Sequence, residues 1–181
     1  MTDSMSRTSR LRLLLVLLVS VVGCDQASKQ YAVTHWAHLE TKPQSYFFDT
    51  FRITFALNKG AFLGMLDKQS PTVRHAILVI GNGLLLVVLA VAILMMPKID
   101  RWSYLAWALV FAGGVGNLID RIRISAVIDF LNLGIGPLRT GIFNVADMAI
   151  TVGFIMLVPQ IFRGEPKETE APATTTPGTP S

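Results

Sequence analysis

The stretch VRHAILVIGNGLLLVVLAVAILMM, which runs from Val73 to Met96, decides the fold class. It is almost entirely apolar, and it ends at Pro97, a residue that a helix interior tolerates poorly. A bilayer core about 30 Å thick is crossed by about 20 mostly apolar residues in an α-helix. The stretch therefore predicts a transmembrane helix.

Three other segments are long and apolar enough, or nearly so, to cross a membrane. They cover about residues 11–31, 102–119 and 143–162. The first is polar in its outer third, the second is rich in glycine, and the third carries polar residues near its ends. With residues 73–96, they predict an all-α membrane protein whose four transmembrane helices form one domain over residues 1–163.

The composition supports a membrane protein and excludes several other classes. Hydrophobic residues make up 51% of the chain and charged residues 15%, whereas soluble domains average about 25% charged residues. The net charge is +4, but the basic residues form no continuous stripe, so we expect no nucleic-acid partner. A single cysteine excludes an intramolecular disulfide and a cysteine-based zinc site, and the three histidines fit no metal-ligand spacing. We therefore expect no metal and no cofactor.

The segments between these helices, and the C-terminal tail, are less apolar. In FRITFAL (Phe51–Leu57) apolar and polar residues alternate, which is the period of a half-buried strand. The following GAFLGML (Gly60–Leu66) predicts a short amphipathic helix on the membrane surface. We interpret Asp120–Ile142 as a loop. The tail from Gly164 lacks large apolar residues and is rich in proline and threonine, so we expect it to be disordered in the cytoplasm.

Basic residues set the expected orientation of the chain. Arg7, Arg10 and Arg12 precede the first segment, and Lys98 and Arg101 lie in the short turn between the second and third segments. Basic residues favour the cytoplasmic side, so we expect both termini and this turn in the cytoplasm. The other two connections then lie at the outer face of the membrane.

The segment VSVVGCDQASK (Val19–Lys29) allows a different interpretation of the N-terminus. An apolar run after basic residues, followed by small residues and Cys24, is also typical of a lipoprotein signal peptide that is cleaved before the cysteine. A lipoprotein normally continues as a soluble domain, however, and not as three more spans. We therefore interpret the segment as the outer half of a retained first helix.

Polar residues are expected to gather at the outer end of the helices. Ionisable residues in membrane spans are costly, and they mark function by default. Helical spacing places them in groups that share a helix face. The groups are Asp25 with Lys29, Asn117 with Asp120 and Arg121, and Asn144 with Asp147, to which the connections add Asn58 and Asp129. Simpler interpretations stay open, namely an interfacial ion pair, helix caps and contacts with lipid headgroups.

Asp129 and Asp147 form the most informative pair. Both are carboxylates in apolar sequence, and no basic residue near either one in sequence imposes a salt bridge. When two carboxylates lie close together, one pKa rises and the other falls, so that one acts as general acid and the other as general base toward water. Such a pair can cleave a peptide without a metal, a serine or a cysteine. A protein that conducts protons or ions would use the same residues.

Five short motifs occur in order among the predicted helices. They are DQASK (25–29), NKGAF (58–62), GGVGNLIDR (113–121), VIDF (127–130) and FNVAD (143–147). In these motifs the chain resembles the lipoprotein signal peptidases (signal peptidase II), which are aspartic proteases of the bacterial inner membrane. The resemblance covers about residues 11–162. Ser28 and Phe62 depart from it, because the family usually has threonine and often alanine at these positions.

This resemblance implies a function and a set of site residues. The catalytic pair would be Asp129 and Asp147. The residues that support them or bind substrate would be Asp25, Lys29, Asn58, Gly60, Asn117, Asp120, Arg121 and Asn144. The substrates would be prolipoproteins that carry diacylglycerol on the lipobox cysteine, cleaved just before that cysteine. The resemblance also implies inhibition by the cyclic peptide globomycin, contact with membrane lipid, and a small extracytoplasmic sheet that cradles the substrate. We further expect a monomer.

Two other classes stay open at this point. A four-span channel predicts acids spread through the depth of the membrane, whereas here they are expected at one face. A membrane-anchored lipoprotein predicts a shortened mature chain that begins at a lipidated Cys24.

Overall fold

The computed structural model describes residues 6–60, 69–96 and 99–162. Its helices are α1 (Arg7–Trp36), the short 3-10 helix η1 (Ala37–Glu40), α2 (Pro71–Met95), α3 (Arg101–Ile124) and α4 (Val145–Phe162). Its strands are β1 (Gln44–Tyr46), β2 (Phe51–Asn58), β3 (Val127–Ile135) and β4 (Leu138–Arg139). The surface helix expected after Gly60 and the tail from Gly164 lie outside the described residues.

Three of the helices, α1, α2 and α3, are long and apolar enough to cross a membrane. The helix α4 is also apolar, but over the shorter range Val145–Gln160. The predicted mostly helical fold is therefore confirmed, and a fourth crossing stays a prediction. Two helices are longer than expected, since α1 continues to Trp36 and α3 to Ile124.

Local sequence explains where α2 and α3 begin. The Ser70 hydroxyl accepts a hydrogen bond from the backbone of Val73, and Pro71 occupies the first turn, where its missing N–H has no cost. The Asp100 carboxylate accepts hydrogen bonds from the backbone of Trp102 and Ser103, both over 3.0 Å. Each cap satisfies N–H groups that the first helical turn leaves free.

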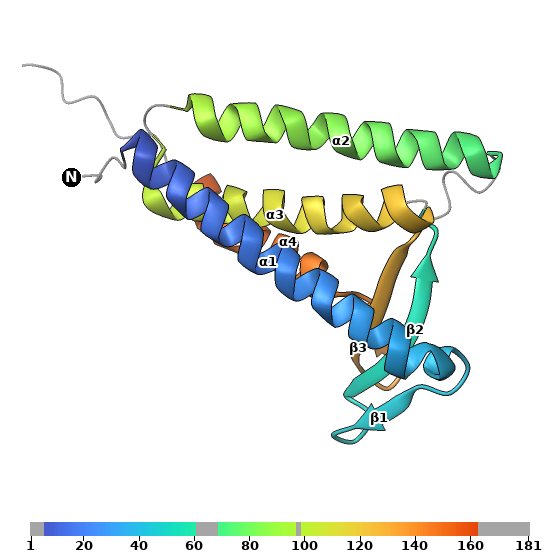
Figure 1. Ribbon diagram of the computed structural model, residues 1–181. Coiled ribbons are helices and arrows are strands. Elements are labelled where there is room, and N and C mark those ends of the chain that lie inside the picture. The colour runs from blue at the N-terminus through green and yellow to red at the C-terminus, as the bar shows by residue number, and fades with distance from the viewer. Residues whose placement is uncertain (1–5, 61–68, 97–98, 163–181) are drawn as a thin grey trace, which may run out of the picture.

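The helix α3 packs against each of the other three long helices (Figure 1). Glycines make these contacts close. A Cβ at Gly113 would clash with the backbone carbonyl oxygen of Ala146 on α4, and one at Gly116 would lie 2.8 Å from the Asp25 carboxylate on α1. These glycines therefore allow α3 to pack closely against α4 and α1.

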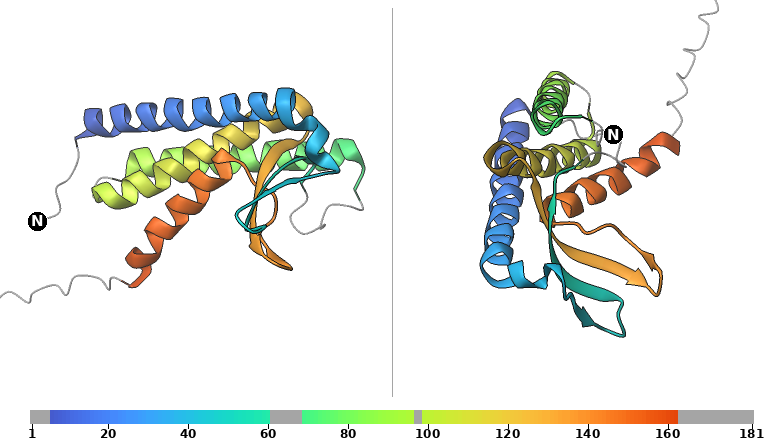
Figure 2. Two further views of the ribbon diagram at one scale, coloured as in Figure 1. Left: turned by 90° about the horizontal axis from the view of Figure 1, so that it is seen from below. Right: turned by 90° about the vertical axis from the view of Figure 1, so that its right-hand side faces the viewer.

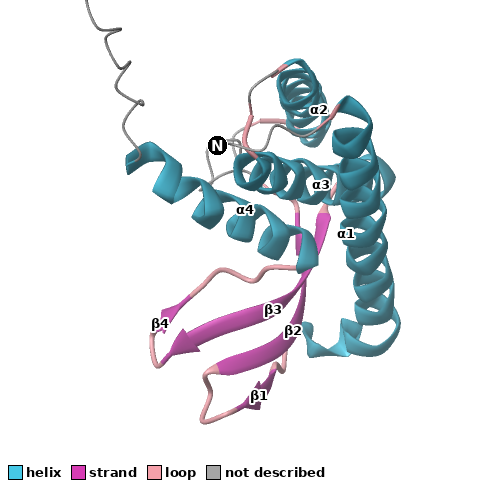
Figure 3. Cartoon of the chain, turned by 90° about the vertical axis from the view of Figure 1, so that its left-hand side faces the viewer, coloured by secondary structure: helices cyan, strands magenta, loops and turns pink. Residues whose placement is uncertain are grey.

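The sheet is antiparallel, with the strand order β1-β2-β3-β4, and it projects from one end of the helical bundle (Figures 2 and 3). The strand β2 confirms the prediction made for Phe51–Leu57. Its partner β3 shows that the loop interpretation of residues 120–142 was wrong for Val127–Ile135. The alternation of apolar and polar residues did not indicate this strand, because Asp129 and Asn132 occupy buried positions where apolar residues are expected.

The N-terminal half of α1 is part of the packed structure. Leu14 belongs to a buried cluster with Tyr104 of α3. The Tyr104 hydroxyl donates a hydrogen bond to the backbone carbonyl of Arg10 over 2.6 Å, and the Arg10 guanidinium donates to the carbonyl of Met96. Cleavage before Cys24 would remove these contacts, so the packing favours a retained first helix.

Candidate active site

Asp129 lies on β3, and only 2% of it is exposed. The pairing of β3 with β2 places Ala56 opposite Asp129 and brings Asn58, at the end of β2, beside it. The Asn58 amide donates a hydrogen bond to Asp129 Oδ2 over 3.0 Å, and the Asn144 amide donates to Asp129 Oδ1 over 2.6 Å. A regular strand, and not the loop that we expected, therefore holds this carboxyl group.

Asp147 lies in the first turn of α4 and is half-buried. It forms a reciprocal cap with Asn144, the residue before the helix. The Asp147 N–H donates to Asn144 Oδ1 over 2.9 Å, and the Asn144 N–H donates to Asp147 Oδ2 over 3.2 Å. This arrangement is a capping box, which fixes a side chain relative to the start of its helix. The second oxygen, Asp147 Oδ1, accepts a hydrogen bond from the Asn117 amide over 2.7 Å.

Two buried amides join the two carboxyl groups. The Asn144 amide, which donates to Asp129, also donates to Asn117 Oδ1 over 3.2 Å, and Asn117 in turn donates to Asp147. Asn144 is fully buried and Asn117 is 6% exposed. The ion pairs formed among the described residues involve other carboxylates. The two acids are therefore oriented by amides, and neither forms a direct salt bridge with another described residue.

Burial raises the pKa of Asp129 to about 6, because it disfavours the charged form of the carboxyl group. The hydrogen bond from Asn58 opposes this rise, the negative charge of Asp147 adds to it, and the hydrogen bond from Asn144 opposes it again. A carboxyl group with this pKa can hold a proton and release it near neutral pH, as a general acid must.

A buried ion-pair cluster is connected to the two acids through Asn117. Lys29 Nζ lies 2.8 Å from carboxylate oxygens of both Asp25 and Asp120, and it donates a hydrogen bond to Asn117 Oδ1 over 3.0 Å. All three charged residues are at most 3% exposed. The pair of Asp25 and Lys29 is therefore buried, and is not the simple interfacial pair that one interpretation allowed. Asp25 also accepts the N–H of Ala146 over 2.9 Å, at the start of α4, where the helix dipole favours a negative charge.

Arg121 and Gly60 lie at the edge of this cluster. Arg121 Nη1 donates to the backbone carbonyl of Asn117 over 3.2 Å, and its charge acts at longer range on the carboxylates of the site. Gly60 has a φ of +40°, and its N–H donates to Asn58 Oδ1 over 2.9 Å. A Cβ at Gly60 would be in ordinary contact with Arg121 Nη2, 3.6 Å away, so it is the positive φ and not the space that favours glycine here.

The structure brings all ten residues of the predicted site together at one end of the bundle. The four aspartates of the site form one cluster, in contrast to the spread that a channel predicts. Sequence reasoning missed Gln26, whose amide donates to Asp120 over 2.9 Å and to Asp25 over 3.2 Å. Helical spacing gave no signal for it, because a residue next to Asp25 lies on a different helix face.

Asp147 also lines an apolar groove of about 510 Å³ between the sheet and α4. Phe51 and Leu131 line it from the sheet, and Met148 and Val152 line it from α4. Among the described residues that line the groove, Asp147 is the only charged one. The groove therefore presents a single carboxyl group among uncharged lining residues.

Comparison with known proteins identifies the family. The sequence matches the Peptidase A8 family model, signal peptidase II, over residues 17–163. The chain belongs to the signal peptidase II family. Lipoprotein signal peptidases of Streptococcus pyogenes serotypes M2 and M5 are each 36% identical to this signal peptidase over 155 residues, which is 85% of this chain and 95% of each relative.

Solved structures support the same fold. A bacterial membrane enzyme determined by the in meso method at 2.3 Å resolution is 25% identical, with a TM-score of 0.72 over 87% of this chain and 92% of the other. A second such enzyme, at 1.9 Å resolution, has a TM-score of 0.74 over 91% of this chain and 99% of the other, at 24% identity. Family membership makes the chain a peptidase, and its apolar helices indicate a multi-pass protein of the bacterial inner membrane.

Proposed function

We propose that this signal peptidase removes signal peptides from prolipoproteins that carry diacylglycerol on their cysteine, and that it cleaves just before that cysteine. Membership of the signal peptidase II family supports the peptidase activity, and the relatives named above are lipoprotein signal peptidases. The observation that carries the mechanism is the amide network that joins Asp129 and Asp147. The apolar groove beside Asp147 suits a substrate that is anchored in lipid.

The two aspartates have different roles in this proposal. Asp129 acts as general acid, and it holds the proton for this step at pH values below its pKa of about 6. Asp147 acts as general base. It is less buried than Asp129 and it lines the groove, so it can reach a water molecule beside the scissile bond.

Cleavage then proceeds in two steps. Asp147 takes a proton from water while the water oxygen bonds to the scissile carbonyl carbon, and Asp129 gives its proton to the carbonyl oxygen, which yields a gem-diol. As the C–N bond breaks, Asp147 passes its proton to the leaving amine of the lipidated cysteine. Asp129 recovers a proton from a hydroxyl of the gem-diol, and both carboxyl groups end as they began.

The proposal includes a topology. The helix α4 makes the fourth crossing, both termini lie in the cytoplasm, and the site lies near the outer face of the inner membrane. Arg7, Arg12 and Arg101 are at the ends of α1 and α3 that lie away from the sheet, as the preference of basic residues for the cytoplasmic side predicts. All the site residues come from one chain, so a monomer is sufficient. Globomycin is the expected inhibitor.

Cleavage of a diacylglyceryl prolipoprotein by the purified protein in liposomes tests this mechanism. Asp129→Asn and Asp147→Asn should each lower turnover by at least about 10³-fold, and the double variant should lower it little further, because the two groups act as a unit. The matched control is Asp100→Asn, since asparagine also caps a helix well and Asp100 caps α3 outside the site. Near-normal turnover in either site variant, or loss of wild-type activity with a chelator, would overturn the two-aspartate mechanism.

A further inference from the structure

The turn between β1 and β2 holds three successive residues in the left-handed backbone conformation. Their φ angles are 51° at Phe47, 55° at Phe48 and 68° at Asp49. This conformation is unfavourable for bulky side chains. Phe47 is nevertheless 79% exposed and Phe48 is fully exposed. Packing within the chain therefore does not account for either phenyl ring.

A polar clamp of Ser45, Asp49, Arg52 and Arg139 holds this turn in place. The Asp49 carboxylate accepts hydrogen bonds from Ser45 Oγ and Arg52 Nε, both over 2.6 Å, and Arg139 of β4 donates to the Asp49 backbone carbonyl over 2.7 Å. The hydrogen bond from Arg52 keeps the pKa of Asp49 well below its usual value, so the clamp stays charged at neutral pH. The chain thus fixes a backbone conformation whose main result is to point two phenyl rings outward.

The neighbouring turn between β3 and β4 is also apolar. Ile135 is 78% exposed and Leu138 is 82% exposed. Figure 3 shows both turns at the end of the sheet that lies away from α2 and α3. Phe47, Phe48, Ile135 and Leu138 therefore lie on two neighbouring turns at this end of the sheet, and we call these four residues the sheet tip.

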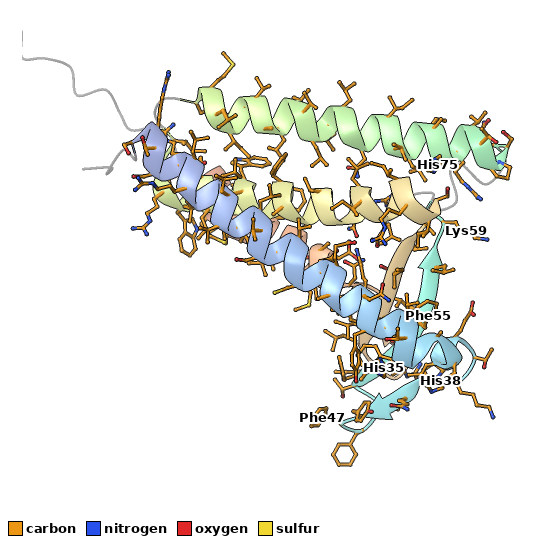
Figure 4. All side chains as sticks on the ribbon, in the orientation of Figure 1. His35, His38, Phe47, Phe55, Lys59 and His75 are labelled. Atoms are coloured by element: carbon orange, nitrogen blue, oxygen red, sulfur yellow. The ribbon has the colours of Figure 1, made fainter. Side chains whose placement is uncertain are left out.

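The position of the sheet tip indicates what covers it. Figure 4 shows Phe47 at the far end of the sheet. Along the direction of the helix axes, it lies between the two ends of α2 and α3 and not beyond them. Figure 1 shows the same for the turn between β1 and β2. A bilayer that surrounds the apolar helices would therefore reach this level. The apolar side chains of the sheet tip lie next to the charged clamp around Asp49. This arrangement matches a membrane interface, where acyl chains give way to headgroups.

We propose that the sheet tip inserts into the membrane leaflet nearest to the sheet. There it anchors the protein in addition to the helices. Phe47 and Phe48 lie among the acyl chains, and the clamp around Asp49 lies at headgroup level. Leu133, which is next to the sheet tip on β3, lines the groove beside Asp147. The anchor thus holds one wall of the groove against the lipid from which an acylated substrate arrives.

Fluorescence quenching in liposomes tests the insertion. Cys24→Ser removes the only native thiol, and Phe48→Cys then carries an environment-sensitive fluorophore. Lipids with a doxyl group on the acyl chain should quench this label several-fold, and aqueous iodide should leave it unchanged. The matched control is Lys42→Cys, at an exposed charged residue between η1 and β1, for which the two quenchers should give the opposite result.

Two outcomes would overturn the anchor. Quenching of the Phe48→Cys label by iodide would place the sheet tip in water. Protection from both quenchers would show that protein covers it, for example a second copy of the chain. The measurement does not depend on cleavage, so the same depth is expected when Asp147→Asn is added. A label in water on an enzyme that still cleaves prolipoprotein would refute the anchor and leave the proposed function standing.

Discussion

The side-chain amide of Asn144 donates a hydrogen bond to the carboxyl group of Asp129 over 2.6 Å. Asn144 is also the N-cap of α4, so one residue connects the start of this helix to the strand β3. A shift of the helix start would therefore move both acids of the site. Preorganisation of this kind is what a reaction with two cooperating carboxyl groups requires.

Asn144→Ala should lower kcat/KM by about 10²-fold, which is the cost of losing one preorganised donor in other active sites. It should also lower the free energy of unfolding by about 1 kcal/mol, because α4 loses its cap. The control is Asp100→Ala, which removes the cap of α3 at a similar cost in stability but touches no site residue. Equal losses of activity in the two variants would show that helix stability matters here, and not the position of the acids.

The activity should fall as the pH rises through about 6, because Asp129 then loses the proton that the carbonyl oxygen must receive. The hydrogen bond from Asn58 lowers the pKa of Asp129, so Asn58→Ala should move this descending limb to higher pH. Profiles of kcat/KM against pH for the two proteins check the direction of the shift. A limb that stays in place would assign the titration to another group.

The helices, and the polar residues that share a helix face, could be predicted from the sequence, because helical periodicity and spacing are local signals. The spacing of Asp25 with Lys29 placed both side chains on one face, and they do share the buried cluster. The strand β3 escaped prediction because Asp129 and Asn132 occupy buried positions in it, and the Asn58 amide that binds Asp129 comes from a distant part of the chain. Gln26 escaped for the same reason, since its contact with Asp120 depends on how α1 packs against α3.

Gly113→Ala should push α3 and α4 apart. Its Cβ would meet the Ala146 carbonyl oxygen and would lie 2.7 Å from the Ile150 side chain, and overpacking of this kind costs about 1–3 kcal/mol. Because Ala146 is adjacent to Asp147, cleavage should fall together with the melting temperature. The control is Gly81→Ala on α2, where a Cβ meets nothing within 4 Å and both quantities should stay near their wild-type values. A tolerated Gly113→Ala would mean that the contact between the two helices can relax without moving the acid.

Lys29→Met should destabilise the protein more than any other single change discussed above. It keeps an unbranched chain of similar length, but it leaves Asp25 and Asp120 buried without their shared cation. An uncompensated buried charge of this kind costs about 3–5 kcal/mol. A large fall in the melting temperature in detergent is therefore expected, and the exposed Lys42→Met serves as the control, with a melting temperature near that of the wild type.

A second substitution separates charge from packing at this position. Asp120→Asn alone breaks an ion pair of 2.8 Å, so it should be destabilising. Combined with Lys29→Met, however, it removes one of the two unpaired carboxylates and should recover part of the melting temperature that Lys29→Met loses. A double variant that is worse than the sum of its single changes would show that the fold depends on the shape of the lysine side chain. Partial recovery would show that Lys29 is buried between α1 and α3 to balance the two acids, and through Asn117 this balance also supports Asp147.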